Sequence, residues 1–349
     1  MNIRISSTLL ALVLATACAS IGPPTIPRDR LDYAEAISRS WMQQMLLNIV
    51  KLRYVEIPMF MEVSSVINQY SLEGNVSVGR TWGDSDFGIA AAGARFSDRP
   101  TITYSPVLGK DFTRSLMTPI PPGAILFLVQ AGWDVEMLFR TCVHAMNGIY
   151  NRGGASVLGR DVPEPLFNEL IDTLASIQRS GLVGLRVEGI EQTSSAFMIL
   201  RNSEDAATNE RLRRVRELLG LSPDATEFRV RYGADSTRDT EIAMLTRSLF
   251  EILIELAKQV DVPQSDIDEL RTVPSTVLDD DDPTRLIHIY HSEAKPENAF
   301  VKVRYRDLWF WIDDRDLPSK RVFGFVLILF NLTDTGSSSA VPLLTVGTR

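Results

Sequence analysis

Apolar residues recur at helical spacing in several long segments of the chain. Between residues 32 and 53 they include Ile37, Trp41 and Met45, each four positions after the last. This period places the three residues on one face of a helix. The same pattern predicts further helices over residues 123–131, 135–149, 164–180, 202–219, 240–260 and 319–332.

The apolar stripe between residues 135 and 149 has clear signals at both ends. Asp134 precedes it, and aspartate is a favoured helix cap. Asn147-Gly148 is expected to stop the helix at its other end. Cys142 belongs to the stripe, so it is expected to lie in the core and to behave as a small hydrophobic residue.

Other segments are rich in β-formers, show strand-like alternation, or both. They follow or precede the predicted helices without forming a regular strand–helix–strand repeat. The expected fold class is therefore α+β, with mixed helices packed on small antiparallel sheets. The predicted strands are residues 182–188, 195–201, 227–232, 286–291, 300–305 and 308–312, with a last one near 343–346.

The segment 59–105 reads as one or more β-hairpins. Glu73-Gly74-Asn75 is expected to be a turn between extended runs, and residues 82–86 and 97–100 are further turn candidates. One interpretation is an ordinary small sheet. The other is a hairpin that joins neighbouring subunits in an oligomeric ring or pore, because strands of small, alternating residues also enter membranes. A pore would require many subunits.

The first residues have the layout of an export signal. Arg4 is followed by a short apolar run, residues 8–15, far below the ~20 residues of a spanning helix. Ala15-Thr16-Ala17-Cys18 resembles the lipobox of bacterial lipoproteins, although Ala15 stands where leucine is usual. The resemblance implies cleavage before Cys18 and acylation of that residue. The alternative is an ordinary signal cut at Ala17 or Ala19.

The residues after Cys18 suit a lipid-anchored protein. Three prolines and a glycine between residues 19 and 28 predict an extended tether. In Gram-negative lipoproteins a residue such as Ala19, rather than aspartate, implies the periplasmic face of the outer membrane. The expected organisation is a signal peptide (1–17), a lipidated tether (18–28), a helix/hairpin/helix region (29–150) and an α+β region (151–349). The last two regions are either separate or one continuous domain.

Composition narrows the classes of function. The 349 residues carry a net charge of −8, which argues against nucleic acid as a partner. Only two cysteines are present, so a lipidated Cys18 would leave Cys142 without a disulfide partner. No phosphate-binding, dinucleotide, zinc-protease or nucleophile-elbow motif occurs, and no metal or other cofactor is expected.

Two acidic clusters and the histidines are the remaining chemical candidates. The aspartates at 279–282 suit a solvated loop, with weak calcium binding as the alternative. His288 and His291 have a spacing that puts them on opposite faces of a strand. Asp313, Asp314 and Asp316 follow a run of aromatic residues. Capping and ion pairing explain them structurally, and a carboxylate site beside aromatics is the functional alternative.

Two parts of the body, residues 305–316 and 130–148, resemble uncharacterised lipoproteins of Gram-negative bacteria, a likeness that implies no activity. The leading expectation is a non-enzymatic structural or assembly component of an envelope complex, with protein partners or copies of itself. A periplasmic enzyme or glycan-binding protein acting at Asp313, Asp314 and Asp316 is the alternative. A pore formed by the 59–105 hairpins is the third.

Overall fold

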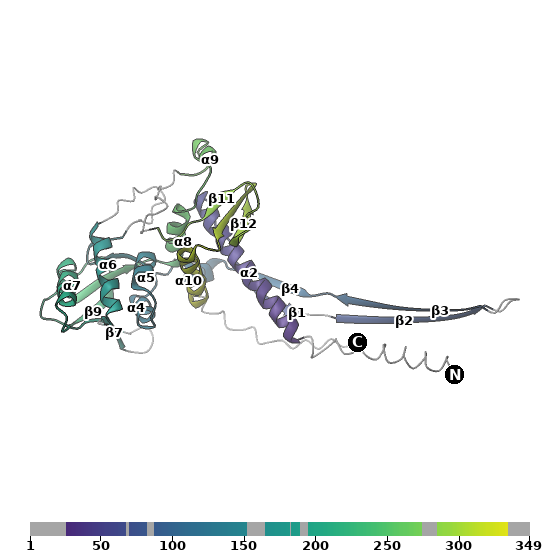
Figure 1. Cartoon of the computed structure of the whole chain (residues 1–349), viewed down its shortest axis with the longest axis horizontal. Coiled ribbons are helices and arrows are strands. Elements are labelled where there is room, and N and C mark those ends of the chain that lie inside the picture. The colour runs from purple at the N-terminus through teal and green to yellow at the C-terminus, as the bar shows by residue number, and fades with distance from the viewer. Residues whose placement is uncertain are drawn as a thin grey trace. The chain divides into compact units, whose positions relative to one another are not determined.

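The computed structural model describes residues 26–67, 70–81, 87–151, 165–181, 183–188, 195–273 and 285–333. The chain divides into two compact units, both drawn in Figure 1. Within the described residues, unit 1 contains residues 26–41 and 60–107, and unit 2 contains residues 42–59 and 108–333. The fold class is α+β, as the sequence predicted.

The first helix, α2, covers Ile26–Arg53. It begins before the predicted start at residue 32, and its first turn includes the last residues of the expected tether. Pro27 stands in that turn, where a missing N–H costs nothing because the first N–H groups of a helix have no intrahelical acceptor. At the other end of α2, Met45, Leu46, Ile49 and Val50 are fully buried.

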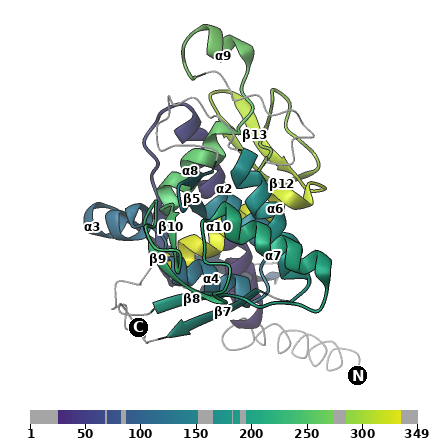
Figure 2. The same cartoon turned by 90° about the vertical axis from the view of Figure 1, so that its left-hand side faces the viewer.

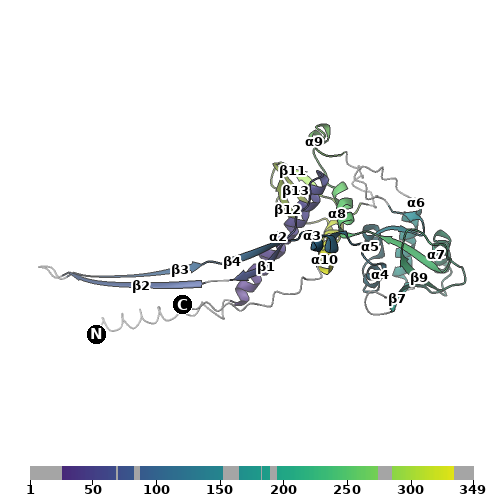
Figure 3. The same cartoon turned by 180° about the vertical axis from the view of Figure 1, so that it is seen from behind.

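Unit 1 contains a two-stranded antiparallel ribbon, which we call the ribbon (residues 61–106). Strand β1 (Met61–Ile67) pairs with β4 (Thr101–Pro106), and β2 (Tyr70–Thr81) pairs with β3 (Phe87–Asp98). Figure 3 shows β2 and β3 side by side along their length. A register shift occurs between Val63 and Ser65, and from Ser65–Thr103 to Thr81–Phe87 the described pairs keep a single register.

The prediction of a turn at Glu73-Gly74-Asn75 is wrong. These residues lie inside β2, where they pair with Arg95, Ala94 and Gly93. The turn propensity of Gly and Asn is outweighed by a ladder of paired residues on both sides of them, because strand preference depends strongly on context.

Unit 2 is built around a six-stranded sheet in the order β6-β5-β10-β9-β8-β7. All neighbours are antiparallel except β9 and β10, which are parallel. The expectation of purely antiparallel sheets is corrected at this one pair. The strands are β5 (Val143–Met146), β6 (Ile149–Tyr150), β7 (Val183–Glu188), β8 (Ser195–Leu200), β9 (Glu227–Tyr232) and β10 (Glu241–Thr246).

Helices pack beside this sheet, as Figure 2 shows for α4 and α6. Helix α4 (Pro122–Gln130) contacts all four strands from β7 to β10. Gly123 of α4 lies against the sheet, where a Cβ would stand 3.6 Å from the Cβ of Ala196, an ordinary van der Waals contact. Helix α5 (Val135–Cys142) packs on α6 (Pro165–Arg179), which packs on α7 (Ala206–Leu218). Since β5 and β6 join strands from beyond residue 183, the sheet crosses the expected boundary at residue 150.

A smaller three-stranded sheet, in the order β11-β13-β12, completes unit 2. Its strands are β11 (Tyr290–Ser292), β12 (Ala299–Tyr305) and β13 (Leu308–Asp313). The remaining helical elements of unit 2 are α3 (Gly109–Phe112), the π-helical turn η3 (Thr113–Met117), α8 (Leu249–Lys258), α9 (Gln264–Asp268) and α10 (Leu317–Thr333). None of the helices in the described ranges is both long and apolar enough to cross a membrane.

Two predicted helices are partly strands. The segment 135–149 forms α5 and then turns into β5 and β6, and the segment 240–260 forms β10 and then α8. The start of α8 has a capping box, in which Ser248 and Glu251 satisfy each other's backbone N–H groups. This pattern separates strand from helix at residue 248. The strand predicted near residues 343–346 lies outside the described residues.

Candidate functional site

The outer face of the small sheet carries a row of aromatic residues. Tyr290 pairs in register with Trp311, and their rings stack with centroids 4.9 Å apart. His288 stacks on the other side of Tyr290 at 3.7 Å. Trp309 lies under the ammonium group of Lys295, 5.6 Å from its ring centre. The indole N–H of Trp311 is buried and meets no acceptor among the described residues.

Asp313 ends β13 beside this aromatic face. The Arg315 guanidinium binds its two oxygens at 3.0 and 2.8 Å, and the Arg315 backbone N–H adds a third bond at 2.8 Å. These bonds to Arg315 lower the pKa of Asp313 to about 2. Asp313 is therefore a carboxylate near neutral pH, which does not suit a general acid.

The other two acidic candidates make contacts around the start of α10. Asp314 accepts from the Lys320 ammonium group at 2.7 Å. Asp316 accepts from the Ser319 backbone N–H at 3.0 Å and from the Ser319 hydroxyl at 2.6 Å. The sequence left either Asp316 or Ser319 as the cap of this helix, and the bond to the Ser319 N–H gives that role to Asp316. The structure thus brings Asp313, Asp314 and Asp316 to one short turn, with a cationic or capping contact for each.

His288 is held in a polar cluster. Its Nε2 lies 2.6 Å from a carboxylate oxygen of Asp261, and its Nδ1 lies 3.2 Å from the Arg285 guanidinium. His291 pairs in register with Phe310, a residue of the core. The two histidines therefore have separate surroundings. Within the described ranges no three His, Cys, Asp or Glu residues are placed to hold a metal ion.

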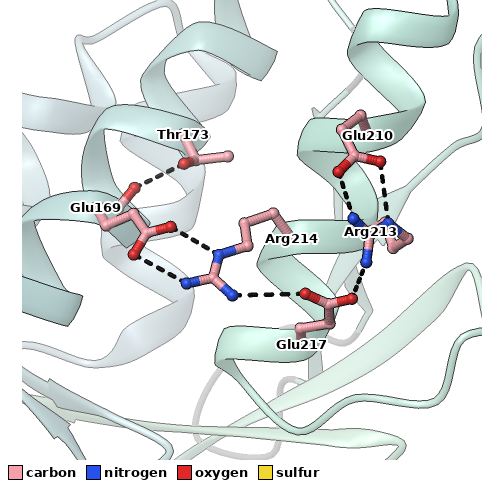
Figure 4. A network of polar contacts seen from close by, with 6 residues as sticks. All are labelled: Glu169, Thr173, Glu210, Arg213, Arg214 and Glu217. Carbon is pink, nitrogen blue, oxygen red and sulfur yellow. Dashed lines mark hydrogen bonds and ion pairs between the residues drawn. The ribbon is translucent and has the colours of Figure 1, made fainter.

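A network of charged side chains joins α6 to α7 on the surface (Figure 4). The Arg214 guanidinium binds both oxygens of Glu169, at 2.6 and 3.0 Å. Arg213 pairs with Glu210 and Glu217 on its own helix. The hydrogen bonds from Arg214 and Arg213 lower the pKa of Glu169 and of Glu210. Such exposed pairs stabilise a fold only weakly, and the network fits a helix–helix contact rather than a reactive site.

Cys142 is fully buried at the end of α5, as the sequence predicted. Burial raises the pKa of its thiol to about 12, so the reactive thiolate is absent at ordinary pH. We expect Cys142 to resist alkylation by iodoacetamide at pH 8 in the folded protein and to react fully in denaturant.

The same measurement reports on Cys18, which lies outside the described residues. Protein extracted from membranes should show no reactive thiol under native conditions if Cys18 is acylated, and one if Cys18 is kept without acylation. Mass spectrometry of the alkylated peptides identifies which cysteine reacted. Rapid native modification of Cys142 would contradict its placement in the core.

The ribbon is the second candidate site, and it is a site of a different kind. Strands β2 and β3 pair with each other, and among the described residues neither pairs with a third strand. Each keeps an outer edge whose backbone groups point away from its partner, and such an edge is a template for another strand. The described residues of β4, including Ile102 and Tyr104, are exposed.

The sequence predicts some of these features, namely the aspartates after β13 and the hairpin-rich segment. The stacking of His288 on Tyr290 was not predicted. The strand predicted over residues 286–291 begins only at Tyr290, so His288 lies before it. The aspartates at 279–282 lie outside the described residues. No protein-family model, curated protein or solved structure matches this chain.

Proposed function

We propose that this protein is a lipoprotein of the outer membrane, facing the periplasm, and that it is a structural or assembly component of an envelope complex. Acylation of Cys18 would anchor it, since several acyl chains hold a protein stably at a bilayer. The ribbon would then supply the contact with other subunits. The anchor rests on the signal-like N-terminus, and the contact rests on the geometry of the ribbon.

The observation that carries the proposal is the length of the ribbon with its open edges. The β2–β3 ladder runs without a break from Tyr70–Asp98 to Thr81–Phe87. An isolated two-stranded hairpin is at best marginally stable in water. A hairpin of this length is therefore best explained by strands from other chains that add to its edges, which is a common mode of protein recognition.

The contacts of the acidic residues favour assembly over catalysis. Asp313 is ion-paired and has a depressed pKa, and Asp316 caps a helix. An acid–base pair needs two groups whose environments push their pKa values apart, and this turn supplies capping and ion pairing instead. Glycan binding at the aromatic face has the buried N–H of Trp311 in its favour, and it stays a prediction, as does the pore.

A shortened ribbon tests the proposal. Replacing residues 71–97 by Asn-Gly joins the paired residues Tyr70 and Asp98 through a two-residue turn of the type that hairpins prefer. We expect the variant to reach the membrane and to keep the thermal transition of unit 2. When membranes are crosslinked and separated by native electrophoresis, we expect wild-type protein to run in a large complex and the shortened variant to be absent from it.

The control is a full-length chain with Arg213→Met on the exposed face of α7, which should retain the complex. A shortened variant that remains in a complex of wild-type size would overturn the proposed function.

A further inference from the structure

The two strands β2 and β3 have residues of opposite charge at one shared register position. Glu73 lies in β2 and pairs directly with Arg95 in β3. The six positions beyond them in each strand, Gly74–Gly79 and Ile89–Ala94, contain no charged residue. One strand therefore has an acidic residue and the other a basic residue at the same register position, next to a band of uncharged residues.

Strand direction makes the two edges fit each other. When two copies of a hairpin lie side by side and point the same way, β3 of one copy is antiparallel to β2 of the next. At equal level this places Arg95 of one copy beside Glu73 of its neighbour, as within each hairpin. Opposite charges on adjacent strands stabilise the pair. A contact between two β2 edges would instead leave both β3 edges open.

The register also sorts the residue types. Because strand residues alternate between two faces, the pairs Leu72–Phe96, Val76–Ala92 and Val78–Ala90 belong to one face. The pairs Ser71–Ser97 and Glu73–Arg95 belong to the other. The first face also holds Asp98 and Arg80, and the second also holds Ile89 and Phe87. A sheet made by adding identical ribbons edge to edge would therefore keep two distinct faces, with the apolar pairs between residues 72 and 78 on one and the Glu73–Arg95 pair on the other.

From these observations we infer that the partner of the ribbon is a second copy of this chain, with the β3 edge of one copy paired to the β2 edge of the next. The inference rests on the proposed function and names its partner. The contact is head-to-tail, and such contacts close into rings when the rotation between copies allows it. In a closed ring every β2 and β3 edge is paired.

Mixed disulfide crosslinking of the full-length chain tests this arrangement. Ser77 and Ala91 pair directly within a hairpin, so they lie at one level on adjacent strands. Two variants of the full-length chain, one with Ser77→Cys and the other with Ala91→Cys, are co-expressed in the same cells and oxidised in membranes. Asn75→Cys and Gly79→Cys replace Ser77→Cys in parallel mixtures, because ring closure shifts neighbours by an even number of residues.

Covalent dimers are expected in one of these mixtures and absent when either variant is expressed alone. Identical positions on successive copies lie two strands, about 10 Å, apart, which exceeds the reach of a disulfide at roughly 7 Å between Cα atoms. The double variant Ser77→Cys with Ala91→Cys in one chain should form an intramolecular disulfide, which verifies the hairpin register.

Other results would overturn the inference. Dimers of Ser77→Cys alone would show β2–β2 pairing, and a purified full-length chain that is monomeric by light scattering and gives no dimer in any mixture would show that copies do not pair. If the shortened ribbon nevertheless dissolves the native complex, the partner is a different protein and the proposed function stands. If the complex survives shortening, the proposed function itself fails.

Discussion

Replacing Asn147 by alanine is expected to lower the free energy of unfolding by about 3 kcal/mol. Asn147 and Gly148 form the two-residue turn between β5 and β6, with φ of 43° and 80°. The Asn147 side chain donates to the Leu219 carbonyl at 2.7 Å and accepts from the Ala243 N–H at 2.6 Å. Alanine would break both bonds and hold a left-handed backbone without the asparagine preference for it.

Asn147→Gly is the matched control, because glycine keeps the turn and loses only the side-chain bonds. It should cost less than alanine, and the difference measures the backbone strain. Urea unfolding followed by tryptophan fluorescence and far-UV circular dichroism gives both values. An alanine variant within about 0.5 kcal/mol of wild type would show that the turn does not need the residue.

Arg247→Met is expected to destabilise the protein by a similar amount, about 3 kcal/mol. Arg247 is 2% exposed. Its guanidinium donates to the Arg140 and Thr141 carbonyls at 2.8 and 3.0 Å, and its own N–H donates to the Cys142 carbonyl at 2.7 Å. Methionine keeps the apolar stem of the side chain but leaves two carbonyls at the end of α5 without this donor.

The same change at Arg213 is the control. Arg213 lies on the exposed surface of α7 and pairs with Glu210 and Glu217, and exposed pairs of this kind contribute at most about 1 kcal/mol. Both variants are measured by urea unfolding. Equal stability losses for the two arginines would mean that capping of α5 by Arg247 is not what stabilises this region.

The positions of most elements could be predicted from sequence, and the errors have identifiable causes. The apolar stripe from Val135 continues past Cys142 at helical spacing, so periodicity alone extends the helix. The chain turns instead because Arg247 and Asn151 bind the last α5 carbonyls. Asn147-Gly148 signals a hairpin as strongly as a helix end, and only the pairing of β5 with a distant β10 decides between them.

For the candidate sites, local chemistry was predictable and long-range pairing was not. The cap made by Asp316 and the burial of Cys142 follow from neighbouring residues. The ribbon required a register between residues far apart in sequence. Short turn signals such as Glu73-Gly74-Asn75 predicted smaller hairpins. The register of two strands is set by the whole ladder of paired residues, which a local turn signal does not reveal.

The single register of the ribbon also determines which changes of length it tolerates. One residue inserted into β2 alone would either form a bulge or move every later residue of that strand to the opposite face. Two residues added to each strand at the same level would keep both faces and the Glu73–Arg95 pair. The ribbon can therefore be lengthened or shortened by equal numbers of residues in both strands. Unequal insertions should disrupt its pairing.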